Sequence, residues 1–213
     1  MPVIKSLLLF TLLSLLIGGC SAPDKPSIAL YLAVQRGDLD QLERHIYWKT
    51  DINAVLPNGQ YPLQVAARKG RIVMVKTLLR HGADINSRSS DDESAVDLAI
   101  LNGRTQIAEL LIDEGATMDA SALLIKAARI GVTDRDTTRF LVERGADTEY
   151  RDDNGDTALL IAIRQDNHRF ATHLVNLGAD VNVKTRDGKS ALAVAKSLAL
   201  GELVSLLERQ GAL

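Results

Sequence analysis

Apolar residues after residue 27 occur in short stripes with helical spacing, and glycines separate the stripes. Residues 57–86 show the pattern best, because an Asn-Gly turn and a proline precede two such stripes. The apolar positions of the first stripe are Leu63, Ala66 and Ala67, and those of the second are Val73, Val75, Leu78 and Leu79. Gly70 and Gly82 follow the two stripes, and glycine ends a helix without backbone strain. The segment therefore predicts a turn and two short helices, each ended by a glycine.

This unit repeats along the chain. The glycines that follow the second helices are 33, 30, 33 and 33 residues apart, and they are Gly82, Gly115, Gly145, Gly178 and Gly211. Alanines of the first helices give the same period of 33 residues, at Ala33, Ala66 and Ala99 and again at Ala162 and Ala195. Two independent sets of residues, the glycines and the alanines, share one period, and this indicates an array of stacked repeats.

The repeated motifs resemble the ankyrin repeat, whose pattern is Thr-Pro-Leu-His, paired alanines, a glycine, paired leucines and Gly-Ala-Asp. The chain keeps this order in YPLQVAARKG, SAVDLAILNG and TALLIAIRQD, and in LLRHGADIN, LVERGADTE and LVNLGADVN. The resemblance covers residues 28–213 and implies an all-α solenoid of about six helix-turn-helix units with short β-hairpin turns. The expected units are 28–53, 54–86, 87–119, 120–149, 150–182 and 183–213, of which the first and last cap the stack.

Two departures from the family pattern affect the expected packing. The family histidine is absent, and its positions hold Gln64, Asp97, Ile125, Leu160 and Ala193. The bonds that this histidine makes between adjacent turns must therefore be made otherwise or be lost. The fourth unit, 120–149, has a shortened hairpin and a longer loop between its helices. Harmless drift explains this irregularity, and so does a local break in the curvature that admits part of a partner.

The first residues form a targeting segment. Lys5 precedes an apolar run that ends in Ile17-Gly18-Gly19-Cys20, which resembles a bacterial lipobox. We expect residues 1–19 to be a signal peptide, Cys20 to carry diacylglycerol and an acyl chain, and residues 20–27 to be a lipidated tether. An ordinary secretory signal that ends near a cysteine is the alternative. The expected location is the periplasmic face of the envelope, and Ser21 favours the outer membrane. The segment 21–26 reaches at most about 20 Å when extended, so a partner must be met close to the bilayer.

Composition and motifs disfavour several classes of function. The formal net charge is −2 and aromatic residues make up 4% of the chain, which disfavours nucleic acid as a partner. The four histidines stand in no metal-ligand motif, and no nucleophile elbow or phosphate loop occurs. We therefore expect no enzyme activity, no metal and no cofactor other than the lipid on Cys20.

A binding surface is expected where the first helices end. This set places basic residues beside apolar ones, a composition enriched in binding hot spots, and comprises Arg36, Arg68, Lys69, Leu101, Arg129, Ile130, Arg164 and Gln165. A second, acidic set lies on the hairpin tips and comprises Asp91, Asp92, Glu93, Asp152, Asp153 and Asp156. In the alternative interpretation, the basic side chains only pair with these acidic tips.

These expectations give two hypotheses for function. In the first, the chain is a tethered immunity or inhibitor protein that neutralises a secreted toxin or lipase in the periplasm. In the second, it is a scaffold that assembles an envelope complex without inhibiting anything. In both hypotheses the partner is a protein, and the chain contacts the membrane only through its lipid anchor.

Overall fold

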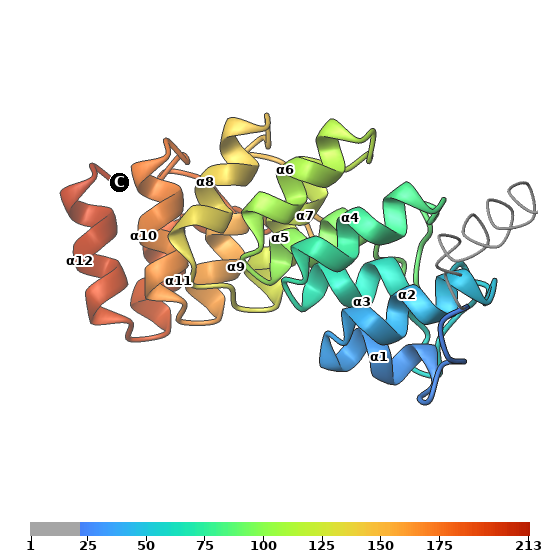
Figure 1. The fold of residues 1–213 in the computed structure, drawn as a ribbon. Coiled ribbons are helices and arrows are strands. Elements are labelled where there is room, and N and C mark those ends of the chain that lie inside the picture. Colours follow the sequence, from blue (N-terminus) through green and yellow to red (C-terminus); the bar gives the residue numbers. More distant parts are fainter. Residues whose placement is uncertain (1–21) are drawn as a thin grey trace, which may run out of the picture.

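The computed structural model describes residues 22–213, and this part of the chain contains twelve α-helices arranged as six pairs (Figure 1). The pairs are α1 (Leu30–Arg36) with α2 (Leu39–Tyr47), α3 (Pro62–Arg68) with α4 (Ile72–Arg80), α5 (Ala95–Leu101) with α6 (Thr105–Asp113), α7 (Ala120–Arg129) with α8 (Arg135–Glu143), α9 (Ala158–Arg164) with α10 (His168–Asn176), and α11 (Ala191–Ser197) with α12 (Gly201–Arg209). The expected all-α solenoid is confirmed.

The loops before the first helices are tight turns and form no β-ladder among the described residues. A single β-bridge joins Lys184 to Ser190. In the second unit, the N–H of Leu56 donates to the carbonyl of Gln60 at 2.8 Å, and the N–H of Gly59 donates back to Leu56 at 2.9 Å. The β-hairpins expected from the resemblance are thus reduced to short hydrogen-bonded turns.

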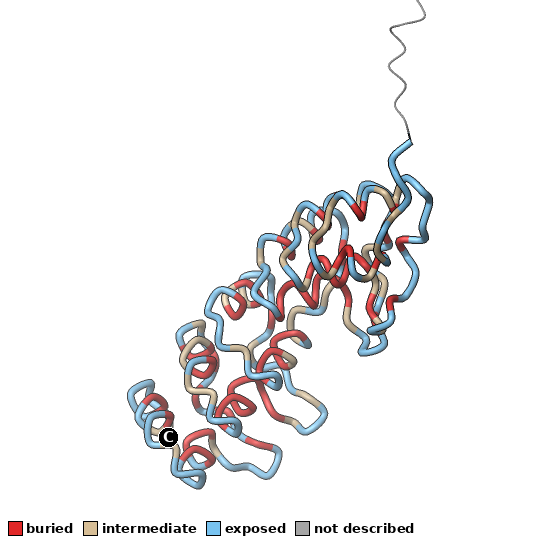
Figure 2. The backbone as a smooth tube through the Cα atoms, turned by 60° about the horizontal axis from the view of Figure 1, so that its bottom comes forward, coloured by how far each residue is buried: buried red, intermediate tan, exposed pale blue. Residues whose placement is uncertain are grey.

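The six pairs stack in one direction into an elongated body (Figures 1 and 2). Each first helix packs on the first helix of the next unit. The alanines of the repeat lie at these contacts, and Ala33, Ala66 and Ala99 are fully buried. Their small side chains allow neighbouring helices to approach closely, so the core runs along the stack as the buried band visible in Figure 2.

Residues other than glycine occupy several helix ends. Gly82 ends α4 with a φ of +86°, as the pattern predicts. Lys49, Asp166 and Ala199 have φ values of 56°, 55° and 57°. A side chain with a Cβ atom disfavours this left-handed conformation. In α4, Met74 is buried and Val73 is 56% exposed, so the inward face of this helix includes Met74 where the pattern predicted Val73.

Gln64 replaces the missing family histidine and still joins two adjacent turns. Its Nε2 donates to the carbonyls of Ser87 at 2.8 Å and Glu93 at 2.9 Å, both in the next unit. Its Oε1 accepts the N–H of Tyr61 at 2.9 Å. Gln64 is fully buried, so these bonds satisfy its whole amide inside the protein.

A row of side-chain acceptors joins neighbouring units, except in the fourth unit, where Ser121 and Asp147 both belong to that unit. Asn53 accepts the N–H of Asp84 at 2.9 Å, and Asn182 accepts the N–H of Leu213 at 2.9 Å. The remaining bonds of this row are Asn86 to Thr117, Ser121 to Asp147 and Glu149 to Asp180. Partners are 31 residues apart, except for Ser121 and Asp147, which are 26 apart because the hairpin of the fourth unit is short.

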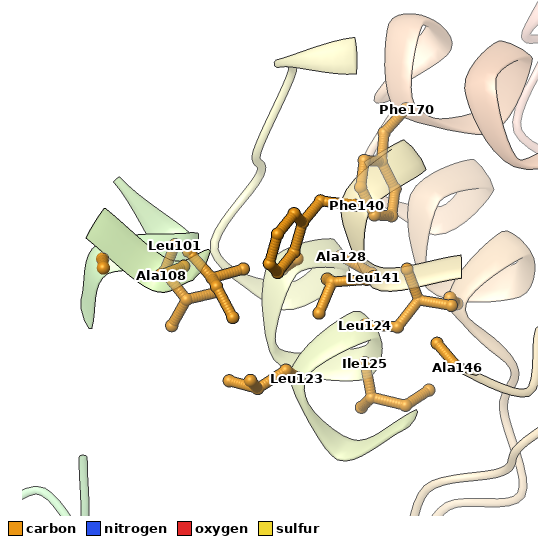
Figure 3. Packing of buried hydrophobic residues seen from close by; sticks show 14 of the residues in the cluster. Leu101, Ala108, Leu123, Leu124, Ile125, Ala128, Phe140, Leu141, Ala146 and Phe170 are labelled. Atoms are coloured by element: carbon orange, nitrogen blue, oxygen red, sulfur yellow. The ribbon is translucent and has the colours of Figure 1, made fainter. Parts of the chain in front are cut away.

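The irregular fourth unit loosens the stack on one side. Helix α7 packs less extensively on α5 than α3 does, whereas it packs closely on α9. Figure 3 shows Leu101 and Ala108 of the third unit facing Leu123 and Phe140 of the fourth across this junction. The irregularity seen in the sequence therefore corresponds to a change in packing between the third and fourth units.

Candidate functional site: a basic edge on the first three units

The C-terminal ends of the first helices lie in a row, because each first helix packs on the next one. Arg36, Arg68, Arg129 and Arg164 are the last residues of α1, α3, α7 and α9. The predicted surface residues therefore share one edge of the stack, but their environments divide them into two groups.

Arg129 of the fourth unit and Arg164 of the fifth unit are about half exposed, and both pair with carboxylates of the same chain. Arg129 Nη2 lies 2.7 Å from Asp152 Oδ2, in the hairpin of the next unit. Arg164 Nε lies 3.1 Å from Asp156 Oδ2, in its own hairpin. These cations hold the hairpins in place, as the alternative interpretation of the sequence proposed.

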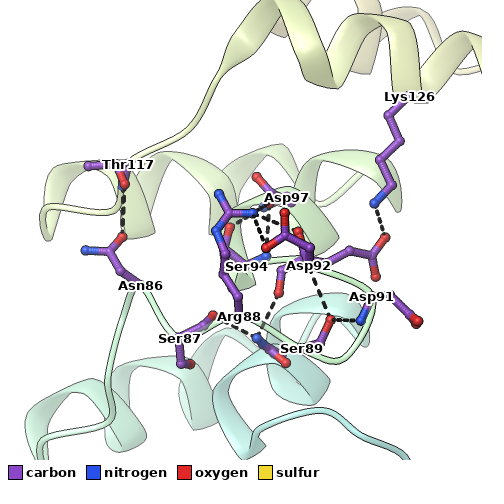
Figure 4. A network of polar contacts seen from close by, with 12 residues as sticks. Asn86, Ser87, Arg88, Ser89, Asp91, Asp92, Ser94, Asp97, Thr117 and Lys126 are labelled. Atoms are coloured by element: carbon purple, nitrogen blue, oxygen red, sulfur yellow. Dashed lines mark hydrogen bonds and ion pairs between the residues drawn. The ribbon is translucent and has the colours of Figure 1, made fainter. Parts of the chain in front are cut away.

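The acidic residues of the hairpins are largely engaged in the same way. The side chains of Asp152 and Asp156 are only 4% and 11% exposed, so they belong to the interior, although the sequence placed them on the partner surface. Lys126 Nζ lies 2.7 Å from Glu93 Oε1, a contact drawn in Figure 4. Asp91 and Asp153 remain exposed, and Asp92 is exposed but lies 3.4 Å from Arg88 Nη1.

Burial raises the pKa of Asp152, but hydrogen bonds from Arg129 and from the N–H groups of Asp156 and Asn154 outweigh it and lower this pKa below the ordinary value of a carboxyl group. Asp152 is therefore a charged structural residue at neutral pH.

The apolar and amide members of the predicted set also differ. Leu101 is 9% exposed and belongs to the hydrophobic core, because it lies at the junction with the fourth unit, so it offers a partner little surface. Ile130 is 56% exposed. Gln165 donates to the carbonyl of Arg129 at 2.9 Å and so joins two units.

Five cations at this edge of the first three units have no ion pair within residues 22–213, whereas Arg44 and Arg88 of the same units pair with aspartates. Arg36 and Lys69 are exposed, and Arg68 is half-buried. Arg71 and Arg104, which the repeat pattern did not indicate as surface residues, extend this group. We call these five residues, Arg36, Arg68, Lys69, Arg71 and Arg104, the basic edge.

Contacts between neighbouring units make the basic edge continuous. Arg71 Nη2 donates to the carbonyl of Arg36 at 3.3 Å, and its guanidinium lies against Gly37, where a Cβ would come within 2.7 Å of Arg71 Cζ. In the same way, Arg104 lies against Gly70, where a Cβ would come within 3.2 Å of Arg104 Nε. Lys69 and Arg104 line one shallow hollow. The sequence signal for both arginines is a Gly-Arg pair at the start of a second helix.

His45 is buried and has two side-chain contacts. His45 Nε2 donates to the carbonyl of Ile28 at 2.8 Å, and His45 Nδ1 lies 3.0 Å from Thr50 Oγ1. Burial lowers the pKa of His173, Arg135 and Arg169 lower it further, and Asp134 opposes them. No group of three or more His, Cys, Asp or Glu side chains in the described part of the chain is arranged to hold a metal ion.

The model of the family "Ankyrin repeats (3 copies)" matches residues 30–122 and 123–212. The chain therefore belongs to the ankyrin-repeat family.

Two curated relatives are longer than this chain. A putative ankyrin repeat-containing protein of Treponema pallidum (strain Nichols) is 32% identical over 133 residues, which cover 60% of this chain and 44% of the relative. An L-asparaginase of Dirofilaria immitis is 30% identical over 192 residues, which cover 86% of this chain and 32% of the relative. The chain thus spans less than half of either protein.

Solved structures with the same fold cover most of the chain. The ankyrin repeat domain of Bcl-3 superposes with a TM-score of 0.71 and 26% identity, covering 89% of this chain and 88% of that one. The chain also resembles a chain in the complex of the predatory endopeptidase Bd0816 from Bdellovibrio bacteriovorus with the immunity protein Bd3460. That match has a TM-score of 0.69 and 27% identity, and covers 87% of this chain and 99% of the other.

None of the helices in residues 22–213 is long and apolar enough to cross a membrane. The predicted signal peptide and Cys20 lie outside the described residues.

Proposed function

We propose that this ankyrin-repeat protein is an envelope lipoprotein that binds one protein partner through its basic edge. The observation that carries the proposal is the contrast between the edge cations of the first three units and those of the fourth and fifth units. Arg129 and Arg164 have carboxylate partners within the chain, whereas the five cations of the basic edge have none among the described residues. A complementary partner presents carboxylates to this edge, because charge complementarity raises both specificity and association rate.

We further propose that binding inhibits the partner, as an immunity protein does. The likeness to a chain of an endopeptidase–immunity protein complex supports this role, because that match spans 99% of the other chain. The partner would then be a secreted toxin or a hydrolase that acts in the periplasm, such as the lipase considered above or an endopeptidase.

The proposed location follows from the lipobox-like Ile17-Gly18-Gly19-Cys20. Lipidation of Cys20 would hold the protein on the periplasmic face of the envelope, with the outer membrane favoured by Ser21. Two or more acyl chains make such anchoring stable.

Partner capture tests the binding surface. The native protein is compared with Arg68→Glu plus Arg71→Glu plus Arg104→Glu and with a control, Lys76→Glu plus Arg80→Glu plus Arg209→Glu. The control residues are exposed cations without an ion pair in residues 22–213, and both triple variants change the net charge equally. We expect the first variant to lose at least about tenfold in affinity and the control to lose little, because direct charge pairs at an interface contribute about 1.4 kcal/mol or more.

The partner's own activity decides between inhibition and assembly. An immunity protein abolishes that activity at a one-to-one ratio, whereas a scaffold binds and leaves it unchanged. Equal binding by the native protein and the basic-edge variant would show that the partner uses another surface.

A further inference from the structure

The segment expected to be a free tether is held against the first unit from Pro23 onward. Trp48 Nε1 donates to the carbonyl of Pro23 at 3.1 Å, and the N–H of Ser27 donates to Gln41 Oε1 at 2.9 Å. Lys25 Nζ lies 5.5 Å from the centre of the Trp48 ring. The tether is therefore much shorter than the sequence predicted.

The short tether places the first unit close to its attachment point. Two residues, Ser21 and Ala22, separate Cys20 from Pro23, so the three steps between their Cα atoms span at most about 11 Å when fully extended. Trp48 binds the carbonyl of Pro23 directly. A lipid on Cys20 therefore brings the end of α2 to the surface of the bilayer that contains the lipid.

An exposed aromatic pair lies at this end of α2. Tyr47 is 54% exposed and Trp48 is 43% exposed, and their rings meet edge to face at 5.6 Å. Aromatic side chains with one polar group are enriched where membrane meets water. The indole N–H of Trp48 already has an acceptor in Pro23, so the ring can leave water without an unpaired donor. Lys25 and Lys49 are exposed beside the pair and keep their charges in water.

We propose that Tyr47 and Trp48 insert into the headgroup region of the bilayer that holds the lipidated Cys20. This inference rests on the lipidation proposed above. The aromatic pair acts as a second contact with the membrane and fixes the orientation of the first unit. The partner's access to the basic edge then depends on that orientation, because the edge begins at Arg36 in the same unit.

Trp48 is the only tryptophan of the chain, so its fluorescence reports on this contact alone. The lipidated protein is reconstituted into vesicles of phosphatidylethanolamine and phosphatidylglycerol, with or without brominated acyl chains. We expect a blue shift of the emission and about twofold quenching by the brominated lipid, since an interfacial side chain lies about 5–10 Å into the boundary with the acyl chains. A protein that begins at Ser21, and so carries no lipid, should show a smaller change.

A reporter at another place on the stack provides the matched control. Trp48→Phe plus Tyr150→Trp moves the indole to the loop between α8 and α9, at the start of the fifth unit and four units away from α2, at a position that is 42% exposed. The lipidated form of this variant should show little quenching. Equal quenching of both reporters would mean that the whole stack lies on the membrane, which would overturn the proposal.

Mass spectrometry of the purified mature chain separates the two possible failures. If Cys20 carries the lipid and brominated chains leave Trp48 unquenched, the aromatic contact is wrong and the anchor stands. If Cys20 carries no lipid, the proposed lipid anchor and the proposed membrane contact of Tyr47 and Trp48 are both wrong. Partner capture tests the residues of the basic edge, so its result does not depend on the lipid anchor or on the aromatic contact.

Discussion

The guanidinium of Arg129 donates a 2.7 Å hydrogen bond to the carboxylate of Asp152 and so joins the fourth unit to the fifth. Asp152 Oδ1 also accepts the N–H groups of Asn154 and Asp156 at 2.9 Å each. One carboxylate thus orders a hairpin and holds it against the preceding unit. An isolated surface ion pair contributes little to stability, but this carboxylate is almost completely buried and fully hydrogen-bonded.

Replacement of Asp152 by asparagine should lower stability in a manner that depends on pH. The pKa of Asp152 is lowered in the folded protein, so ionisation stabilises the fold above the ordinary pKa of about 3.9. This contribution is lost as the pH falls through the lower folded pKa. We expect Asp152→Asn to cost about 1 kcal/mol at pH 7 and progressively less below about pH 4. Thermal unfolding of both proteins at several pH values tests this, and a difference independent of pH would contradict it.

Gln64 should be a stabilising residue that histidine replaces better than leucine does. Gln64→Leu leaves the carbonyls of Ser87 and Glu93 without their buried donor, at a cost of about 2–3 kcal/mol. Gln64→His retains one donor near the same carbonyls and should recover part of this loss. Urea unfolding measures both differences. Equal stability of the leucine and native proteins would show that the amide bonds contribute nothing.

Ala199→Gly should stabilise the last unit. Ala199 has a φ of +57°, which glycine adopts with less strain, and we expect a gain of up to about 1 kcal/mol. The matched control is Ala193→Gly in the interior of α11, which is also exposed and should cost about 1 kcal/mol. The thermal midpoints of the two variants should move in opposite directions, and a parallel shift would refute the strain argument.

The sequence predicts the architecture well because each unit carries its own signals. Gly82 ends α4 with a positive φ, and Pro62 begins α3, as the local pattern requires. Ser94, Thr157 and Ser190 accept backbone N–H groups at the starts of α5, α9 and α11. These features depend on neighbouring residues in the chain, so one sequence is sufficient to predict them.

The candidate site depends on contacts between units, which the sequence pattern does not contain. Arg68 and Arg129 hold equivalent positions in the repeat, yet Arg129 has an aspartate within reach and Arg68 has no ion pair among the described residues. Leu101 was expected to be exposed because its helix position is equivalent to that of Arg68, but packing at the irregular junction buries it. The sequence pattern does not indicate the membrane surface proposed at Trp48 for a similar reason, since the contact of Trp48 with Pro23 spans 25 residues.

The sparse packing between α5 and α7 predicts that the stack unfolds as two cooperative blocks. In a repeat array each unit gains stability mainly from its neighbours, so a weak junction lets the two sides open separately. The basic edge lies entirely on the block before that junction. A partner bound there protects this block from unfolding by mass action and leaves the exchange of amide hydrogens in α9 to α12 nearly unchanged.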